Sequence, residues 1–356
     1  MCIFATKKKR MISFESDYNN GANPDVLRHL VETNDEQTLT YGFDRFSDSA
    51  RKKIAAECGV SVADVHLLTG GTQTNATVID AMLRSYEAVI CPNTGHINVH
   101  EAGAIEASGH KVIGLPHQGG KLEAQTLDHF MNVFENDESR DHVAQPGMVY
   151  ISHPTEMGTL YAADELAALY DTCHKHHLQL FVDGARLGYA LAAKGSTITL
   201  PFLSQHTDAF YIGGTKVGAL CGEAVVFTHG NTPRCFFTII KRHGALLAKG
   251  RLTGVQFDAL FTDRLYHRIS RHAIDMAERL KKILVGARLQ MFVDSPTNQQ
   301  FVVLPNALMH RLEQQVLFIH WEPFDDDHTV CRFVTSWATT AEELDTLQEI
   351  LSEANP

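Results

Sequence analysis

A lysine and an aspartate 33 residues apart have the clearest potential for chemistry in this chain. Lys216 lies in a glycine-rich turn after an apolar run, and Asp183 ends the apolar run 178–182. In pyridoxal phosphate (PLP) chemistry, a lysine forms a Schiff base with the cofactor and a carboxylate keeps the pyridine nitrogen protonated. Either residue alone is weak evidence, because loop lysines are usually solvated and strand-end aspartates usually form turns or helix caps. The pair, in this order, predicts a PLP site.

The turn Gly70-Gly71-Thr72 offers a place for an anion. It follows a predicted strand and opens a predicted helix, so free backbone N–H groups and hydroxyls converge there. Alone it is a generic helix start; beside Lys216 and Asp183 it predicts that Gly71 and Thr72 bind the cofactor phosphate. The turn lacks the spacing of a dinucleotide fingerprint, which argues against a nucleotide-binding oxidoreductase.

The elements that must position these residues alternate between strand and helix. Predicted strands cover residues 65–68, 88–91, 111–115, 148–152, 178–182, 209–212 and 224–227. The predicted helices cover residues 74–86, 99–108, 124–135 and 163–176, with another after Gly184. This alternation predicts an α/β fold with a mostly parallel sheet. Ligands bind at the carboxyl ends of such strands, where Asp183 and the Gly70-Gly71-Thr72 turn fall.

After residue 230 the pattern becomes that of a small α+β domain. A long helical pattern at 257–285 precedes a helix at 306–314 and strands at 291–293, 300–304, 317–320 and 331–335. Thr340 and Glu343 form a capping box that opens the last helix. We therefore divide the chain into a flexible leader (1–11), a large domain with the N-terminal segment (12–255), and a connecting helix with a small C-terminal α+β domain (256–356).

Composition narrows the classes of partner and the location. The net charge of −11 and the lack of a basic stripe argue against nucleic acid and against an anionic membrane surface. No apolar stretch is long enough to span a bilayer. Seven cysteines without a CxxC motif predict reduced thiols and a cytoplasmic location. The run Cys173–His177 ends a predicted helix, where basic residues suit the helix dipole, so we predict no metal site.

The chain resembles the L-threonine aldolases of the low-specificity type, in the aromatic-amino-acid β-eliminating lyase group. The resemblance runs from about Ile12 to the C-terminus, and its most specific motifs are Asp183-Gly-Ala-Arg186 and Gly214-Thr-Lys216. The supporting motifs are Phe14-Glu-Ser16-Asp17, Thr40-Tyr41-Gly42-Phe-Asp44, Gly70-Gly-Thr72, Gly95-His96-Ile with Glu101-Ala-Gly103, Lys249-Gly-Arg251 and Arg332-Phe-Val-Thr335. It implies an aspartate aminotransferase-like (type I PLP) large domain and PLP as the cofactor.

The resemblance also implies residue roles. Lys216 would be the Schiff-base lysine, Asp183 the partner of the pyridine nitrogen, and His96 the residue stacked on the cofactor ring. Three further residues would hold the substrate carboxylate, a task that suits the arginine fork, and Arg186 would also help to bind the cofactor. These three are Ser16, Arg186 and Arg332.

One position departs from the family pattern. Many members carry a histidine in the loop after the central strand, but this chain has His153-Pro-Thr155-Glu156 there, and Glu156 occupies the matching position. The proton of the substrate hydroxyl would then be handled by Glu156 or by His96, with His153 as an outside candidate. A cap or ion pair for Glu156 is the structural alternative.

The implied reaction is retro-aldol cleavage of L-threonine or L-allo-threonine to glycine and acetaldehyde, within glycine biosynthesis and threonine catabolism. The resemblance further implies a homotetramer, built as a dimer of dimers with active sites at subunit interfaces. Tyr41 and Arg251 are candidates to reach a neighbouring subunit's site, where Arg251 would bind the cofactor and Tyr41 the substrate. Two alternatives stay open: another type I PLP enzyme, such as a β-eliminating lyase or aminotransferase, and a catalytically silent PLP-binding protein.

Overall fold

The computed structural model describes residues 11–354 and centres on a seven-stranded sheet of order β2-β8-β7-β6-β5-β3-β4. Its strands are β2 (Val65–Leu68), β3 (Glu87–Pro92), β4 (Val112–Leu115), β5 (Gln145–Ser152), β6 (Gln179–Asp183), β7 (Ala209–Gly213) and β8 (Glu223–Phe227). β8 is antiparallel to both its neighbours, and all other pairs are parallel. The carboxyl ends of β2 to β7 and the start of β8 therefore share one edge.

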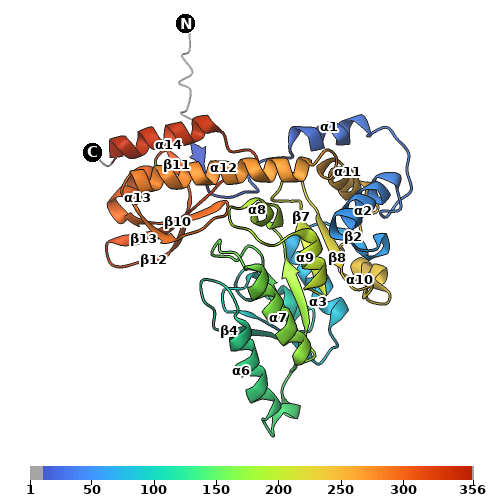
Figure 1. Ribbon diagram of the computed structural model, residues 1–356. Coiled ribbons are helices and arrows are strands. Elements are labelled where there is room, and N and C mark those ends of the chain that lie inside the picture. The colour runs from blue at the N-terminus through green and yellow to red at the C-terminus, as the bar shows by residue number, and fades with distance from the viewer. Residues whose placement is uncertain (1–10, 355–356) are drawn as a thin grey trace.

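Helices cover both faces of this sheet (Figure 1). Because side chains alternate along a strand, Val149 and Leu180 pack in one hydrophobic layer and Tyr150 and Phe181 in the other. The first layer includes α2 (Arg45–Cys58), α6 (Ala124–Glu135), α7 (Ala163–Lys175), α8 (Leu187–Ala192), α9 (Leu200–Gln205), α11 (Arg251–Leu260) and α12 (Leu265–Gly286). The second includes α3 (Gly71–Met82), α4 (His96–Val99), α5 (Ala104–Ala107) and α10 (Phe236–Arg242). This part of the chain thus forms three layers, α/β/α, and the predicted α/β fold with a mostly parallel sheet is confirmed.

A second sheet forms the C-terminal part, at the left of Figure 1. It is antiparallel in the order β12-β13-β10-β9, and α12 leads into it from the large sheet. The elements are β9 (Gln290–Val293), β10 (Gln299–Pro305), α13 (Asn306–Leu312), β11 (Val316–Leu317), β12 (Ile319–Pro323), β13 (His328–Val334) and α14 (Ala341–Ala354). The predicted capping box is confirmed, since Thr340 Oγ1 accepts from Glu343 N and Glu343 Oε2 accepts from Thr340 N.

The N-terminal segment joins this second part before the chain enters the large sheet. β1 (Ile12–Ser13) pairs in parallel with β11, and Phe14 is fully buried in the C-terminal core. α1 (Pro24–Glu32) follows and packs on α11. Residues 11–23 therefore cross between the two sheets. The predicted leader falls almost wholly outside the described residues, and the domain boundary at residue 255 stays a prediction.

Two predicted helices are wrong in extent. The helix expected at 99–108 is two short turns, α4 and α5, separated by Ala102 and Gly103, which adopt left-handed φ values of 51° and 75°. The helix expected at 257–285 is broken into α11 and α12, because Asp263 and Arg264 are left-handed at φ 48° and 56°. Neither break contains a proline, so the helical pattern continued across it. Within residues 11–354, no helix is long and apolar enough to cross a membrane.

Candidate active site

A cavity of about 590 Å³ lies at the carboxyl edge of the large sheet, with part of its wall from the C-terminal sheet. Its lining includes eight of the residues predicted from the sequence: Gly71, Thr72, His96, Glu156, Asp183, Arg186, Lys216 and Arg332. Arg332 of β13 and Trp321 of β12 come from the C-terminal sheet. The site therefore combines residues at the strand ends of the large sheet with side chains from strands of the C-terminal sheet.

Asp183, the last residue of β6, is buried, lines the cavity and accepts four hydrogen bonds. Its Oδ1 accepts from Tyr211 Oη at 2.5 Å and from Ala185 N at 2.9 Å. Its Oδ2 accepts from Tyr150 Oη at 2.5 Å and from Asn75 Nδ2 at 3.0 Å. Burial raises the pKa of a carboxyl, but here the positive charge of His96 and the two tyrosine hydroxyls outweigh burial and lower the pKa of Asp183. Asp183 is therefore a carboxylate at neutral pH.

Lys216 follows the neighbouring strand, β7, in a turn fixed by a buried acid. Glu223 accepts from Gly214 N at 3.1 Å through Oε2 and from Thr215 Oγ1 at 2.7 Å through Oε1. Tyr189 Oη donates to Lys216 O at 2.5 Å. Burial raises the pKa of Glu223 to about 8, while the hydroxyl of Thr215 and the charge of Lys216 act in the opposite direction. The backbone on both sides of Lys216 is thus held in place.

The glycines beside these residues are required by close backbone approach. A Cβ on Gly184 would lie 1.8 Å from Tyr211 O, and a Cβ on Gly213 would lie 2.2 Å from Ala185 O. The ends of β6 and β7 therefore come together only without side chains at these two positions. This approach places Asp183 and Lys216 on the same cavity.

Arg186 is held by an acid from the N-terminal segment. Its Nε donates to Asp17 Oδ2 at 2.7 Å and its Nη2 donates to Asp17 Oδ1 at 3.0 Å. Both side chains are buried, and the pKa of Asp17 is lowered, since the charge of Arg186 outweighs burial. Two of the five N–H donors of Arg186 are therefore already engaged, and the remaining donors, on Nη1 and Nη2, are left for its predicted contact with the substrate carboxylate.

Arg332 has donors to spare. Its Nη1 donates to Gln299 Oε1 at 3.2 Å, whereas its Nε is buried and has no hydrogen-bond partner. Burial and the neighbouring positive charge of Arg186 lower the pKa of Arg332. A half-buried guanidinium with free N–H donors, in a cavity that a second guanidinium also lines, is suited to an incoming carboxylate.

Glu156 lines the cavity and its Oε1 accepts from Ser152 Oγ at 3.0 Å. His153, the outside candidate for a base, is buried and is not among the lining residues. Burial lowers the pKa of His153 to about 4, so it is neutral at pH 7. Between these two residues, the geometry favours Glu156.

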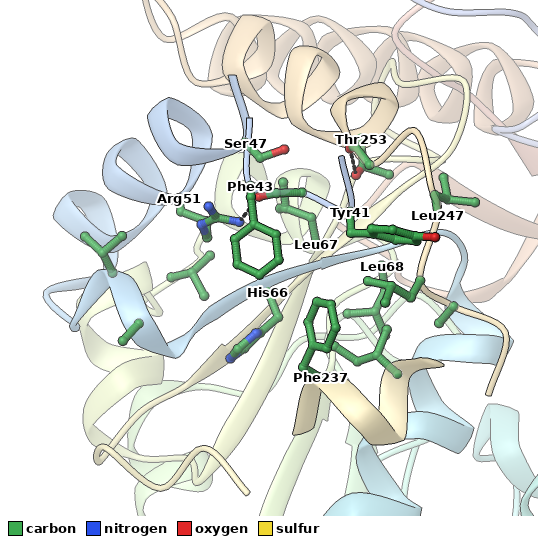
Figure 2. Close-up of a pocket in the computed structure, with 18 residues that line it drawn as sticks. Tyr41, Phe43, Ser47, Arg51, His66, Leu67, Leu68, Phe237, Leu247 and Thr253 are labelled. Atoms are coloured by element: carbon green, nitrogen blue, oxygen red, sulfur yellow. Dashed lines mark hydrogen bonds between the residues drawn. The ribbon is translucent and has the colours of Figure 1, made fainter. Parts of the chain in front are cut away.

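Three predicted residues lie away from this cavity within the chain. Ser16 is half-buried and accepts from Tyr18 N at 3.4 Å. Arg251 donates to Glu36 O and Thr33 O. Tyr41 lines a different pocket of about 340 Å³, shown in Figure 2, together with Phe43 and Phe237.

The cavity fits pyridoxal phosphate. The amine of Lys216 is available for a carbonyl carbon, and the carboxylate of Asp183 for a ring nitrogen. The N-terminus of α3 presents free N–H groups at Gly71 and Thr72, and a Cβ on Gly71 would lie 3.3 Å from Tyr211 Oη, within this cradle. Fold and site together define a type I PLP enzyme.

Comparison with known proteins agrees with this class. The model of the beta-eliminating lyase family matches residues 16–306. The low-specificity L-threonine aldolase of Pseudomonas sp. is 30% identical over 277 residues, which cover 76% of this chain and 78% of that protein. The solved threonine aldolase of Leishmania major is 37% identical with a TM-score of 0.93, covering 97% of this chain and 100% of that one. The aspartate aminotransferase of Thermus thermophilus, at 14% identity and a TM-score of 0.70 over 97% of this chain and 91% of that one, shares the fold.

The chain belongs to the beta-eliminating lyase family. The resemblance to threonine aldolases, the aspartate aminotransferase-like fold and PLP as the cofactor, all predicted from motifs, are confirmed. The chain is thus a lyase of a PLP-dependent family.

Several residues of the site escaped the sequence reasoning. Asp17 and Glu101 stood in recognised motifs but received no role, and Asn75, Tyr150 and Glu223 were passed over. One signal was available: a carboxylate at the start of a fully buried strand, such as Glu223, requires buried donors. The tyrosines carried no signal, since a strand tyrosine usually belongs to the core.

Proposed function

We propose that this protein is an L-threonine aldolase, which cleaves the Cα–Cβ bond of L-threonine or L-allo-threonine to give glycine and acetaldehyde. The observation that carries this proposal is one cavity containing the amine of Lys216, the ionised Asp183 and the spare donors of Arg332. The names of the threonine aldolase relatives support the choice of substrate.

Each residue has a task in this proposal. PLP, when bound, supplies the electron sink for the pair released from the broken bond. Lys216 holds the cofactor covalently between turnovers, and Asp183 keeps a proton on the ring nitrogen. Arg332 binds the substrate carboxylate and so sets which bond at Cα is cleaved. Glu156 accepts the proton of the β-hydroxyl.

The test is a product assay on purified protein saturated with PLP. With L-threonine, we expect equal amounts of glycine and acetaldehyde, the latter followed by NADH oxidation with added alcohol dehydrogenase. Release of ammonia with a keto acid would instead indicate a β-eliminating lyase, and a keto acid formed without ammonia, only when a 2-oxo acid is added as the amino acceptor, an aminotransferase. The Lys216→Ala variant is the control and should not cleave L-threonine. After borohydride reduction of the wild-type protein, a covalent PLP adduct on a lysine other than Lys216 would contradict the assignment of Lys216.

We also propose that copies of the chain assemble so that Tyr41 and Arg251 complete the cavity of a neighbour. Both lie away from the cavity of their own chain, and the pocket beside Tyr41 exposes Phe43 and Phe237, whose ring centroids are 5.7 Å apart (Figure 2). Exposed aromatic clusters of this kind are typical of protein interfaces. A dimer, or a tetramer built from two dimers, would bury them.

Subunit mixing tests the shared site. Lys216→Ala and Arg251→Ala should each be nearly inactive, yet a refolded equimolar mixture should regain about a quarter of the wild-type activity, because half of the dimers are hybrids with one intact site. No recovery from a mixture shown to contain hybrid dimers would mean that Arg251 acts within its own chain.

The free state of all six cysteines among the described residues supports the proposed cytoplasmic location.

A further inference from the structure

Glu101 is a fully buried carboxylate behind the cavity wall. Its Oε1 accepts from His96 Nδ1 at 2.8 Å and from Asn75 Nδ2 at 2.7 Å. Its Oε2 is buried and has no hydrogen-bond partner. The side chain of Glu101 has no exposed surface, whereas the side chain of His96 is 28% exposed and lines the cavity.

The charge of Glu101 requires a positive partner. A buried carboxylate without a counter-charge is strongly unfavourable, and an orphaned oxygen makes it more so. Among residues 11–354, His96 is the basic side chain that forms an ion pair with Glu101. The contact therefore favours a proton on Nδ1 of His96 and a positive charge on the ring.

Asn75 ties this pair to the acid at the end of β6. Its Nδ2 donates both to Glu101 Oε1 and to Asp183 Oδ2, at 2.7 Å and 3.0 Å. Two buried carboxylates thus share one amide group, and neither gains a full counter-charge from it. This arrangement increases the demand for positive charge on His96, which pairs with Glu101 and whose charge also acts on Asp183.

We propose that Glu101 is a positioning residue that holds His96 with Nδ1–H toward Glu101 and Nε2 toward the cavity, and that keeps the ring positively charged. This inference rests on the proposed function, since it concerns the same site. A charged His96 is a hydrogen-bond donor at Nε2, so it is not the acceptor of the substrate proton, and Glu156 is left for that task. Burial lowers the pKa of His96, but the contact with Glu101 outweighs it and the net direction is upward.

The groups that face His96 are Glu101, Glu156, Asp183, Lys216 and His100. The acids favour the charged ring, and Lys216 disfavours it. His100, whose ring centroid lies 5.5 Å from that of His96, has a lowered pKa because of burial and the charge of His96. Removal of Glu101 alone should therefore lower the pKa of His96, while the other acids that face the ring, Glu156 and Asp183, remain in place.

The test compares Glu101→Gln with Glu106→Gln in the holoenzyme. Glutamine keeps the size and an acceptor but removes the charge, and Glu106 is an exposed acid in the adjacent helix α5. Histidine-labelled protein is titrated by NMR, with the His96 signal assigned from His96→Phe. Loss of an opposite charge at hydrogen-bond distance should lower the His96 midpoint by about 1 to 3 pH units, and Glu106→Gln should leave it unchanged.

The pH profile of threonine cleavage gives a second readout. In Glu101→Gln, the limb that reports His96 should move to lower pH by the same amount as the NMR midpoint. An unchanged His96 midpoint in Glu101→Gln would overturn the proposal. If Glu101→Gln fails to fold, Glu101→Asp is the second variant, because it keeps the charge but moves the carboxylate away from His96. A His96 midpoint equal to wild type in Glu101→Asp would also overturn the proposal. If the wild-type holoenzyme does not cleave threonine but the His96 midpoint still shifts in Glu101→Gln, the proposed function is refuted and the positioning role of Glu101 stands.

Discussion

The buried ion pair between Asp17 and Arg186 joins the N-terminal segment to the site, and we predict that its loss destabilises the protein. Three donors converge on the two oxygens of Asp17: Nε and Nη2 of Arg186, and Nδ2 of Asn298 at 2.9 Å. In Asp17→Asn, the amide has one oxygen to accept, and its NH2 group faces one of these donors. The positive charge of Arg186 is also left without its partner in a buried place.

The expected loss follows from burial. Breaking a buried ion pair by removing one partner costs about 3–5 kcal/mol of unfolding free energy. With an unfolding entropy of about 2.1 cal/mol/K per residue over this chain, that loss lowers the melting temperature by roughly 4–7 °C. Because the pKa of Asp17 is lowered in the folded state, its stabilisation is present above the unfolded pKa and is lost as the pH falls through the folded value. The gap between wild type and variant should therefore begin to narrow below about pH 4 and close fully only below the folded pKa of Asp17.

The assay is thermal unfolding followed by circular dichroism at pH 7 and at pH 3.5. Asp48→Asn is the matched control, because Asp48 forms an exposed ion pair with Lys52 at 2.7 Å, worth at most about 1 kcal/mol. Adding Arg186→Met to Asp17→Asn removes the stranded charge and should recover part of the stability. A melting temperature for Asp17→Asn within about 1 °C of wild type at pH 7 would refute the reasoning.

Three further predictions concern the cavity itself. Arg332→Lys keeps the charge but loses the planar guanidinium fork, so KM for L-threonine should rise at least tenfold while the cofactor absorbance stays unchanged; an unchanged KM would make Arg332 structural. Glu156→Gln should slow cleavage by roughly 10²- to 10⁴-fold and leave exchange of the glycine α-proton untouched, whereas equal loss of both would point to a general disturbance. Because the folded protein binds the proton of Glu223 more tightly than the unfolded chain does, stability should fall between pH 4.5 and about 8. Glu223→Gln should flatten that slope in denaturant titrations, and an unaltered slope would count against a protonated Glu223.

The edge on which the site lies could be predicted from sequence because it depends on local pattern. An apolar run followed by Asp183, and another followed by glycines and Lys216, are strand ends of a parallel sheet, and such ends meet at one edge. That logic placed Lys216, Asp183, Gly71 and Thr72 together. The motif resemblance added Arg332, which lies in the C-terminal sheet and has no local signal that would bring it there.

The pairing of side chains within the site could not be predicted in the same way. Asp17 and Arg186 are 169 residues apart, and the segment that carries Asp17 follows β1, which pairs with the distant strand β11. The contact between Glu101 and His96 depends on the break between α4 and α5, which the helical pattern concealed. Such contacts arise from how separate elements pack, and periodicity within one element carries no information about that packing.

The charges around the cavity divide into two kinds. Arg186 is paired with buried Asp17, and Glu101 with His96, so these charges are already compensated within the protein. Lys216 and Arg332 have no such acid partner at salt-bridge distance among the described residues, and both line the cavity with Glu156. Compensated pairs hold geometry, because moving either member exposes a buried charge. Uncompensated groups are available to a ligand, and in the proposed function they match the carboxylate and the β-hydroxyl of the amino acid. We therefore propose that Asp17, Arg186 and Glu101 mainly hold the geometry of the site. Lys216, Arg332 and Glu156 are then the residues that act on the ligand.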